Sequence, residues 1–278
     1  MRMDGRKQKE ESGRKDDGVT EGEGIGMNRK TALITGAAKG IGRRIALEMA
    51  EAGYNIVVNY RSGESQAQKL CKEAETCGVR ALPVYADMSV TEDIRRMYET
   101  AIETFGQLEV VVNNAGISSE VYFLEATEEM FDKMTAVDWK GLYFSSQIAA
   151  RHMIEKQVKG VIINISSNQV DGCWPRATIY GPTKAAVSKF TKNAAMELAP
   201  YGIRMAAVAP GYTDVGWEPG DIRLEAAARL PLKRFATTGE IAKGVVYLAS
   251  EDAAYITGTT LTIDGGATLP VVAANDFV

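Results

Sequence analysis

A glycine-rich turn between an apolar strand and a helix restricts this chain more than any other feature. Residues 31–34 are strand-like, residues 35–42 read Thr-Gly-Ala-Ala-Lys-Gly-Ile-Gly, and residues 43–50 have helical spacing. Gly36 permits a tight turn, Gly40 lets the backbone approach phosphates, and the helix N-terminus offers unpaired N–H groups. This order predicts a cradle for a diphosphate. A glycine-rich loop without a ligand is the alternative, which the flanking strand and helix disfavour.

Strands and helices alternate along the chain as far as residue 266. Short apolar strands separated by helices predict a parallel sheet that is covered by helices on both faces. We therefore expect an α/β fold, a single Rossmann-type doubly wound domain with a parallel seven-stranded sheet. The expected strands are residues 31–34, 56–60, 79–85, 108–112, 161–165, 204–208 and 260–263, and the expected helices include 128–156, 179–198 and 222–229.

Residues 1–28 differ in composition from the rest of the chain. They mix both signs of charge with glycine and contain few apolar side chains, so burial cannot offset the cost of ordering them. We expect a disordered charged tail, with an arm over a ligand or a neighbouring subunit as the alternative. Residues 29–278 form the expected single domain, and a chain of 278 residues is long enough to bury a sizeable core.

Composition excludes several classes of protein. The net charge of -4 gives no general basis for nucleic-acid binding, and no apolar run approaches the roughly 20 residues of a membrane span. The three cysteines lack metal-type spacing and His152 is the sole histidine, so we expect no metal site and no Ser-His-Asp triad. Reduced cysteines and the lack of a signal-peptide core predict a cytoplasmic protein.

Three residues in the second half of the chain have a spacing that suits catalysis. Tyr180 and Lys184 are four residues apart and share one face of a helix, and Ser167 precedes the tyrosine by thirteen residues. A nearby ammonium favours the phenolate, which suits Tyr180 to act as a general acid or base near neutral pH. Pro182 is tolerated because it falls in the first turn of the helix.

Two further motifs complete a family pattern. Residues 113–116 read Asn-Asn-Ala-Gly after the fourth strand, and residues 210–211 read Pro-Gly after the sixth. With these motifs the chain resembles the short-chain dehydrogenase/reductase family from about residue 29 to residue 266. It is similar to glucose dehydrogenases, 3-oxoacyl reductases and hydroxysteroid dehydrogenases alike. Enoyl reductases space the tyrosine and lysine more widely, so the chain fits that class poorly.

The resemblance implies an NAD(P)-dependent short-chain alcohol dehydrogenase or ketoreductase. In such an enzyme Tyr180 protonates the alkoxide that forms when hydride reaches a carbonyl carbon, Ser167 binds that oxygen, and Lys184 helps to relay protons. Ser166 could instead be the strand-ending serine, but the spacing to the tyrosine favours Ser167. The cofactor residues that the resemblance implies are Gly36, Gly40, Ile41, Gly42, Asp87, Met88, Asn114, Ala115, Gly116, Tyr180, Lys184, Pro210, Gly211 and Thr213.

Asp138 departs from the family pattern, which has an asparagine at the matching position. The asparagine supports a water molecule in the proton relay behind the lysine. We count Asp138 among the catalytic residues and expect its charge to raise the pKa of Lys184 and to change the pH profile. The alternative is a protein that senses nucleotides without turnover.

The residues at the end of the second strand and just after it indicate which cofactor is preferred. An NAD site usually has an acid there, which takes the ribose hydroxyls and repels a 2′-phosphate. Here the residues are Tyr60, Arg61 and Ser62, and Lys39 adds a second cation. A guanidinium suits phosphate, so we expect NADP(H), with NAD(H) possible if these cations are only solvated.

The substrate is less well defined by the sequence. The resemblance implies a lid at residues 212–232, and Trp174 and Trp217 offer aromatic walls that suit a steroid or a sugar ring. We therefore expect a ketone or secondary alcohol on an alicyclic substrate of hydroxysteroid or sugar type. A 3-oxoacyl thioester reductase is the alternative. The resemblance also implies a homotetramer.

Overall fold

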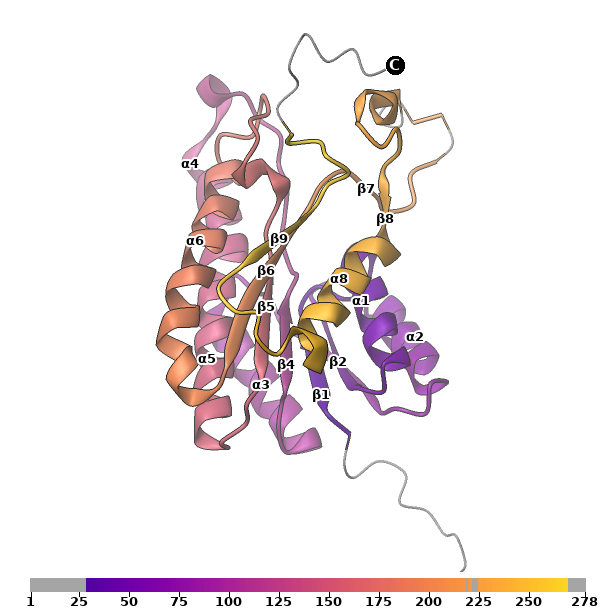
Figure 1. Ribbon diagram of the computed structural model, residues 1–278, viewed down its shortest axis with the longest axis vertical. Helices are drawn as coiled ribbons and strands as arrows, with labels where there is room; N and C mark the ends of the chain where they lie inside the picture. The colour runs from indigo at the N-terminus through magenta and orange to yellow at the C-terminus, as the bar shows by residue number, and fades with distance from the viewer. Residues whose placement is uncertain (1–28, 219, 222–224, 270–278) are drawn as a thin grey trace, which may run out of the picture.

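The computed structural model describes residues 29–218, 220–221 and 225–269. Within them the chain forms one parallel sheet of seven strands in the order β3-β2-β1-β4-β5-β6-β9, with helices on both faces (Figure 1). This confirms the doubly wound α/β fold expected from the sequence. The expected tail, residues 1–28, lies outside the described residues.

The seven strands of the sheet are short, and a separate pair of two-residue strands, β7 and β8, lies beyond it. The strands are β1 (Thr31–Ile34), β2 (Asn55–Tyr60), β3 (Ala81–Tyr85), β4 (Val110–Asn113), β5 (Val161–Ile165), β6 (Arg204–Pro210), β7 (Thr213–Asp214), β8 (Ala236–Thr237) and β9 (Thr260–Ile263). The α-helices are α1 (Gly40–Glu51), α2 (Glu64–Glu75), α3 (Thr91–Phe105), α4 (Glu128–Thr135), α5 (Leu142–Glu155), α6 (Tyr180–Leu198) and α8 (Thr238–Ala249).

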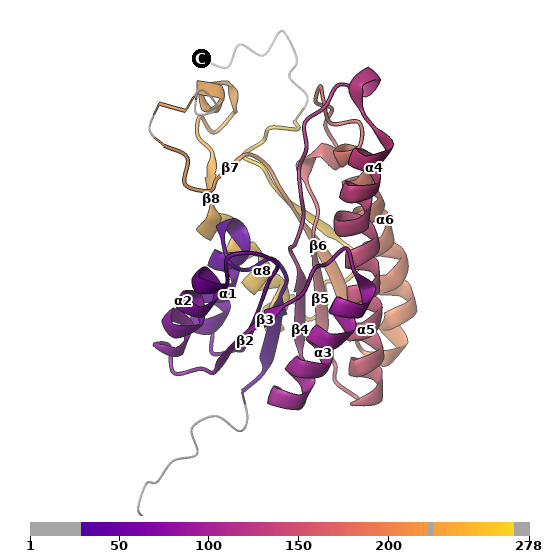
Figure 2. The same cartoon turned by 180° about the vertical axis from the view of Figure 1, so that it is seen from behind.

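Alternate residues of each strand enter two separate cores. Ile34 and Val112 pack with α1, α2 and α8 on one face, whereas Leu33 and Val111 pack with α3, α5 and α6 on the other. Figure 2 shows the two helical layers on either side of the sheet. Because both faces are buried, the strands are apolar at successive positions, which is the pattern that the sequence displays.

The strand order reverses beside β1, and this places the functional sequences together. β1 pairs with β2 on one side and with β4 on the other, with Ile34 opposite Val112. The glycine turn after β1 and the Asn-Asn-Ala-Gly sequence after β4 therefore leave the sheet side by side. In a parallel sheet, the crevice at this reversal is where ligands bind.

Several expected elements differ in their bounds. β3 and β4 begin two residues later than expected, which leaves the order of strands unchanged. The expected helix at 128–156 is divided by a π-helical turn, η2 (Ala136–Gly141), where Gly141 packs so closely on the Met88 carbonyl that a Cβ would clash. Of the expected helix at 222–229, Ala226–Arg229 forms a 3-10 turn and residues 222–224 lie outside the described residues.

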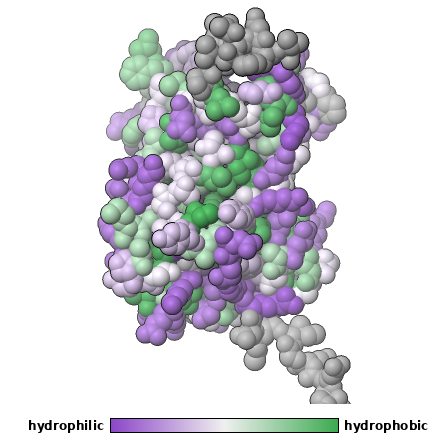
Figure 3. All heavy atoms as spheres, in the orientation of Figure 1, coloured by the Kyte–Doolittle hydropathy of each residue, from purple (hydrophilic) through white to green (hydrophobic). Residues whose placement is uncertain are grey.

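The surface seen in Figure 3 is mostly polar, with apolar side chains gathered near the middle, over β9 and α8. β9 ends the sheet on this side, since β6 is its one partner in the described sheet. No helix in the described ranges is long and apolar enough to cross a membrane. His152 lies in the last turn of α5, where its ring accepts a hydrogen bond from the Leu108 N–H.

Candidate active site

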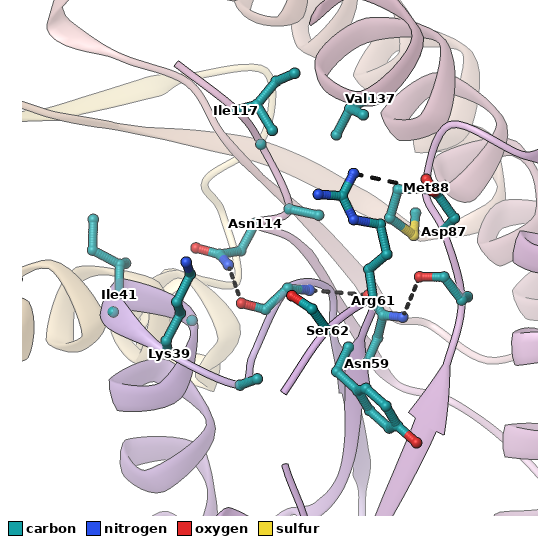
Figure 4. Close-up of a pocket in the computed structure, with 18 of the residues that line it drawn as sticks. Lys39, Ile41, Asn59, Arg61, Ser62, Asp87, Met88, Asn114, Ile117 and Val137 are labelled. Carbon is teal, nitrogen blue, oxygen red and sulfur yellow. Dashed lines mark hydrogen bonds and ion pairs between the residues drawn. The ribbon is translucent and has the colours of Figure 1, made fainter. Parts of the chain in front are cut away.

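A cleft of about 500 Å³ opens where β1, β2, β3 and β4 end (Figure 4). Most of the residues that the sequence predicts for cofactor binding line this cleft. They are Gly36, Lys39, Gly40, Ile41, Gly42, Tyr60, Arg61, Ser62, Asp87, Met88, Asn114, Ala115 and Gly116. The other predicted residues, Tyr180, Lys184, Pro210, Gly211 and Thr213, are not among its lining residues.

The glycine turn has the backbone shape that a phosphate cradle requires. Gly36 and Gly40 have φ angles of 63° and 57°, in the left-handed region that favours glycine. Gly42 has no room for a side chain, because a Cβ would lie 2.6 Å from the Gly36 carbonyl oxygen. The N-cap of α1, Lys39, supplies no side-chain cap, so the first N–H groups of the helix remain available to a ligand. These features fit the diphosphate of a dinucleotide.

Thr35 and Asn114 hold the turn against the end of β4. The Thr35 hydroxyl accepts hydrogen bonds from the N–H groups of Asn114 and Ala115, both at 2.9 Å. In return, the Asn114 amide donates to the carbonyl oxygens of Thr35 and Gly36 at 2.8 and 3.2 Å. The position of the cradle is thus set by side chains that directly follow β1 and β4.

Asn59 is a lining residue that the sequence analysis did not single out. Its side-chain oxygen accepts from the Gly36 N–H at 3.0 Å, and its amide donates to the Ala86 carbonyl at 3.2 Å, as Figure 4 shows. It therefore ties the turn to the ends of β2 and β3. The signal was present in the sequence, because a polar residue within a buried apolar strand needs hydrogen-bond partners. The other unexpected lining residues are Ala38, Ala86, Ile117, Val137 and Val215.

An ion pair of Arg61 and Asp87 lies at the end of the cleft beside β2. Arg61 leans across the cleft to Asp87, with 4.0 Å between the guanidinium nitrogen and the carboxylate oxygen. Burial raises the pKa of Asp87, but hydrogen bonds from Ser89 and the charge of Arg61 outweigh it and hold the pKa below its usual range. Asp87 is thus a carboxylate, and Arg61 remains half exposed and able to turn toward a ligand.

The predicted serine, tyrosine and lysine come from two adjacent elements. Ser167 is the second residue after β5, whereas Tyr180 begins α6 and Lys184 is buried one turn later. The Lys184 ammonium lies 5.5 Å from the centre of the Tyr180 ring and donates to the Ile165 carbonyl at 3.2 Å. The structure therefore places the three side chains on neighbouring ends of β5 and α6.

Ser166 and Ser167 differ in their hydrogen-bond partners, and those of Ser166 give it a structural role. Its hydroxyl contacts the Ser188 hydroxyl at 2.8 Å and donates to the Lys184 carbonyl at 3.1 Å, both within α6. The Ser167 oxygen instead accepts from the Gln169 N–H at 3.2 Å, which leaves its own hydrogen free to be donated to a ligand. Of the two serines, Ser167 alone suits a substrate oxygen.

Comparisons with known proteins agree with this geometry. A family model described as enoyl-(acyl carrier protein) reductase matches residues 36–268. A 3-oxoacyl-[acyl-carrier-protein] reductase of Staphylococcus aureus is 38% identical over 240 residues, 85% of this chain and 97% of that protein. Glucose 1-dehydrogenase 2 of Bacillus subtilis is 35% identical over 248 residues, 87% of this chain and 96% of that protein.

A solved structure shows the same fold at similar identity. A short chain dehydrogenase from Burkholderia cenocepacia in complex with NADP matches with a TM-score of 0.81 and 30% identity, covering 87% of this chain and 98% of that one. The chain belongs to the short-chain dehydrogenase/reductase family. It is an NAD(P)-dependent oxidoreductase of that family, as the sequence led us to expect.

In this short-chain dehydrogenase/reductase, a buried aspartate lies behind the lysine. Asp138 sits in the π-helical turn η2 and is 0% exposed. One of its oxygens accepts from the Ile117 N–H at 2.8 Å, and the other lies 3.1 Å from the Lys184 ammonium. Burial lowers the pKa of Lys184, but the charges of Tyr180 and Asp138 outweigh it, so the pKa lies above the usual 10.5. Lys184 is therefore a cation throughout the neutral range.

The residues after β6 lead into residues 212–232, the segment in which the sequence analysis expects a lid. Gly211 must be glycine, because a Cβ would lie 2.6 Å from that of Asp264. Thr213 is buried on β7 and its hydroxyl donates to the Gly211 carbonyl at 3.1 Å. Beyond them Val215 reaches the cleft, where it lies opposite Gly40. The segment thus passes over the phosphate cradle, while Pro210, Gly211 and Thr213 remain outside the cleft lining.

Aromatic side chains join the lid segment to the loop between Ser167 and Tyr180. The Trp174 indole N–H donates to the Tyr212 hydroxyl at 2.7 Å. Tyr212 stacks on Phe235 with 5.4 Å between ring centres, and Trp217 meets the edge of Phe235 at 5.2 Å. Sequence reasoning found the two tryptophans but missed Phe235, which becomes a neighbour only through the pairing of β7 with β8.

The Asp138–Lys184 pair predicts how an isosteric change alters the pH profile. In Asp138→Asn no negative charge remains behind Lys184, so the positive charge of the lysine acts more fully on Tyr180. We expect the rise of the alcohol-oxidation rate with pH to move about one pH unit lower, an effect of roughly 1.4 kcal/mol. Rates measured across pH test this, with the exposed Asp132→Asn as the control. An unchanged profile contradicts it.

Proposed function

We propose that this enzyme uses NADP(H) to interconvert a secondary alcohol and a ketone on an alicyclic substrate of hydroxysteroid or sugar type. The main support is the Tyr180–Lys184 pair beside a cleft shaped for a dinucleotide. The Lys184 ammonium lies 5.5 Å from the centre of the Tyr180 ring. The support for an alicyclic substrate is the aromatic wall of Trp174 and Tyr212, against which the C–H face of a ring can pack.

The proposed chemistry assigns one role to each side chain. The bound nicotinamide supplies hydride to, or takes it from, the carbon that bears the reacting oxygen. Tyr180 gives a proton to that oxygen in reduction and removes it in oxidation. Ser167, whose oxygen is already engaged by the Gln169 N–H, donates its hydrogen to the same atom and orients it. Lys184 stays charged and favours the phenolate, and Asp138 holds Lys184 in place.

Cofactor binding is proposed to run along the cleft from β2 to α6. The first turn of α1 with Gly36, Gly40, Ile41 and Gly42 binds the diphosphate, and Asp87 and Met88 border the adenine. Arg61, Ser62 and Lys39 take the 2′-phosphate. The remaining contacts are proposed for Tyr60, Asn114, Ala115, Gly116, Tyr180, Lys184, Pro210, Gly211 and Thr213.

A 3-oxoacyl thioester reductase is the second candidate. Its support is the 38% identity to the Staphylococcus aureus reductase, which slightly exceeds the 35% to the Bacillus subtilis glucose dehydrogenase. Enoyl reduction is less well supported, because the four-residue spacing from Tyr180 to Lys184 is too short for that class. NADPH oxidation with keto-sugars, ketosteroids and 3-oxoacyl thioesters separates the candidates.

Removal of the phenol hydroxyl tests the acid/base role. In Tyr180→Phe we expect turnover to fall by about 10²–10⁴, the usual contribution of a positioned acid or base. NADPH affinity should change no more than about fivefold, because one net hydrogen bond is at stake. Steady-state rates and NADPH fluorescence titration measure the two effects. Retained turnover would remove Tyr180 from the mechanism.

Removal of the guanidinium tests the cofactor preference. In Arg61→Ala we expect NADPH to bind about 10–100 times more weakly, because a charge-assisted contact to the 2′-phosphate is lost. NADH lacks that phosphate, so its affinity should change by less than about threefold. Lys69→Ala, an exposed cation on α2, controls for the change in net charge. Equal losses for both cofactors contradict the assignment.

We also propose a homotetramer that acts in the cytoplasm. The support is an aromatic cluster on α5, α6 and η2, where Trp139 and Tyr143 meet Phe190, beside a groove of about 130 Å³. The apolar area over β9 and α8 in Figure 3 offers a second surface. Light scattering at micromolar concentration should give the mass of four chains of 30.1 kDa each. The mass of a monomer contradicts the tetramer.

A further inference from the structure

Asp87 is the one acidic side chain among the described residues that line the cleft. The other charged side chains of this lining are the cations Lys39 and Arg61, which we assign to the 2′-phosphate of NADP(H). In an NAD site, an acid takes the ribose hydroxyls and repels such a phosphate. A carboxylate in the same cleft as the two cations therefore works against the binding of the phosphate.

The pairing of β2 with β3 brings Asp87 close to Arg61. Tyr60 lies opposite Tyr85 in this pair, and Arg61 and Asp87 follow them by one and two residues. The guanidinium nitrogen lies 4.0 Å from the carboxylate oxygen, and Figure 4 shows the arginine side chain reaching across the cleft toward it. Asp87 is the one ion-pair partner of Arg61 in the described part of the chain. The acid thus acts on the end of β2 from the neighbouring strand.

Asp87 is fixed in place, whereas Arg61 has room to move. One carboxylate oxygen of Asp87 accepts from the Ser89 N–H at 2.9 Å and from the Ser89 hydroxyl at 2.7 Å. The Asp87 N–H donates to the Asp93 carboxylate at 3.1 Å, which also holds the backbone. The Asp87 side chain is 25% exposed, and that of Arg61 is 50% exposed. When a ligand competes for this ion pair, the arginine is therefore the partner that moves.

A phosphate and a carboxylate are alternative partners for one guanidinium. The planar group presents paired N–H donors that match either anion. NADPH brings a second anion to Arg61, so its binding has to separate the arginine from Asp87. NADH brings no phosphate at this position and leaves the ion pair without a competitor. The existing pair thus disfavours one of the two cofactors.

We propose that Asp87 acts through Arg61 to set the cofactor preference of the enzyme, and that it reduces the preference for NADPH. The ion pair is exchanged for the 2′-phosphate when NADPH binds and is kept when NADH binds. This rests on the proposed contact of Arg61 with the phosphate. It goes beyond that contact, because it assigns the degree of preference to a second residue on another strand.

Asp87→Asn tests the inference, because the amide keeps the size of the side chain and an oxygen for Ser89 but carries no charge. Dissociation constants of NADPH and NADH are measured by fluorescence titration for the wild type, Asp87→Asn, Arg61→Ala and the double variant. In Asp87→Asn we expect the ratio of the NADH to the NADPH constant to rise at least about threefold, within the range of an exposed ion pair. A contact of Asp87 with the adenine is common to both cofactors, so its loss cancels in this ratio.

The Arg61→Ala background separates an effect through Arg61 from a direct effect on the phosphate. In that background, Asp87→Asn should change the ratio by less than about 1.5-fold, because the coupled partner is gone. The exposed Asp132→Asn controls for the change in net charge.

Two results would overturn the inference and leave the cofactor assignment standing. One is a rise in the ratio of less than about threefold in Asp87→Asn, and the other is a rise above about 1.5-fold that persists without Arg61. Equal weakening of both cofactors in Arg61→Ala alone would instead remove the phosphate contact itself, and the inference would fall with it.

Discussion

The hydrogen bonds that join Thr35 and Asn114 across the ends of β1 and β4 are the constraint on which the site depends. Parallel pairing of these two strands places the glycine turn beside the Asn-Asn-Ala-Gly sequence. The reciprocal bonds between side chains and backbone then fix the turn in a shape with two left-handed glycines. Asn59 adds the third support, from β2. A cradle built in this way is in place before a ligand arrives, so its binding does not have to pay for ordering the loop.

A buried polar network relates this cradle to the proposed catalytic residues. Asn113 accepts from Ser145 on α5 and donates to Asn164 on β5, which in turn donates to Thr191 on α6. All of these side chains are buried, so each bond fixes the position of one element against another. Asn164 lies on β5, which ends two residues before Ser167, and Thr191 lies on the helix that carries Tyr180 and Lys184. The network therefore holds β5 against α6, and so sets the distance between Ser167 and Tyr180.

The sequence was enough to predict those parts of the site that lie within one continuous segment of the chain. The turn at residues 35–42 was readable because glycine positions and the flanking strand and helix are local, and the same holds for the Tyr180–Lys184 spacing. Asn59 was not found, because its hydrogen-bond partners come from the turn after β1 and from the end of β3. The expected helix at 128–156 was wrong at Ala136–Gly141, where packing against Met88 and the pairing of Asp138 with Lys184 favour a wider turn over regular periodicity.

The buried Asp138 carboxylate has opposite effects on Lys184 and on Tyr180. For Lys184 the carboxylate compensates the cost of burial, since a lone ammonium that is only 3% exposed would tend to lose its proton. For Tyr180 the same carboxylate cancels part of the positive field that would favour the phenolate. Asp138 thus keeps Lys184 charged, and at the same time weakens the effect of that charge on the Tyr180 phenol. The ion pair therefore fixes the position of the ammonium beside the phenol ring more than it strengthens the positive field there.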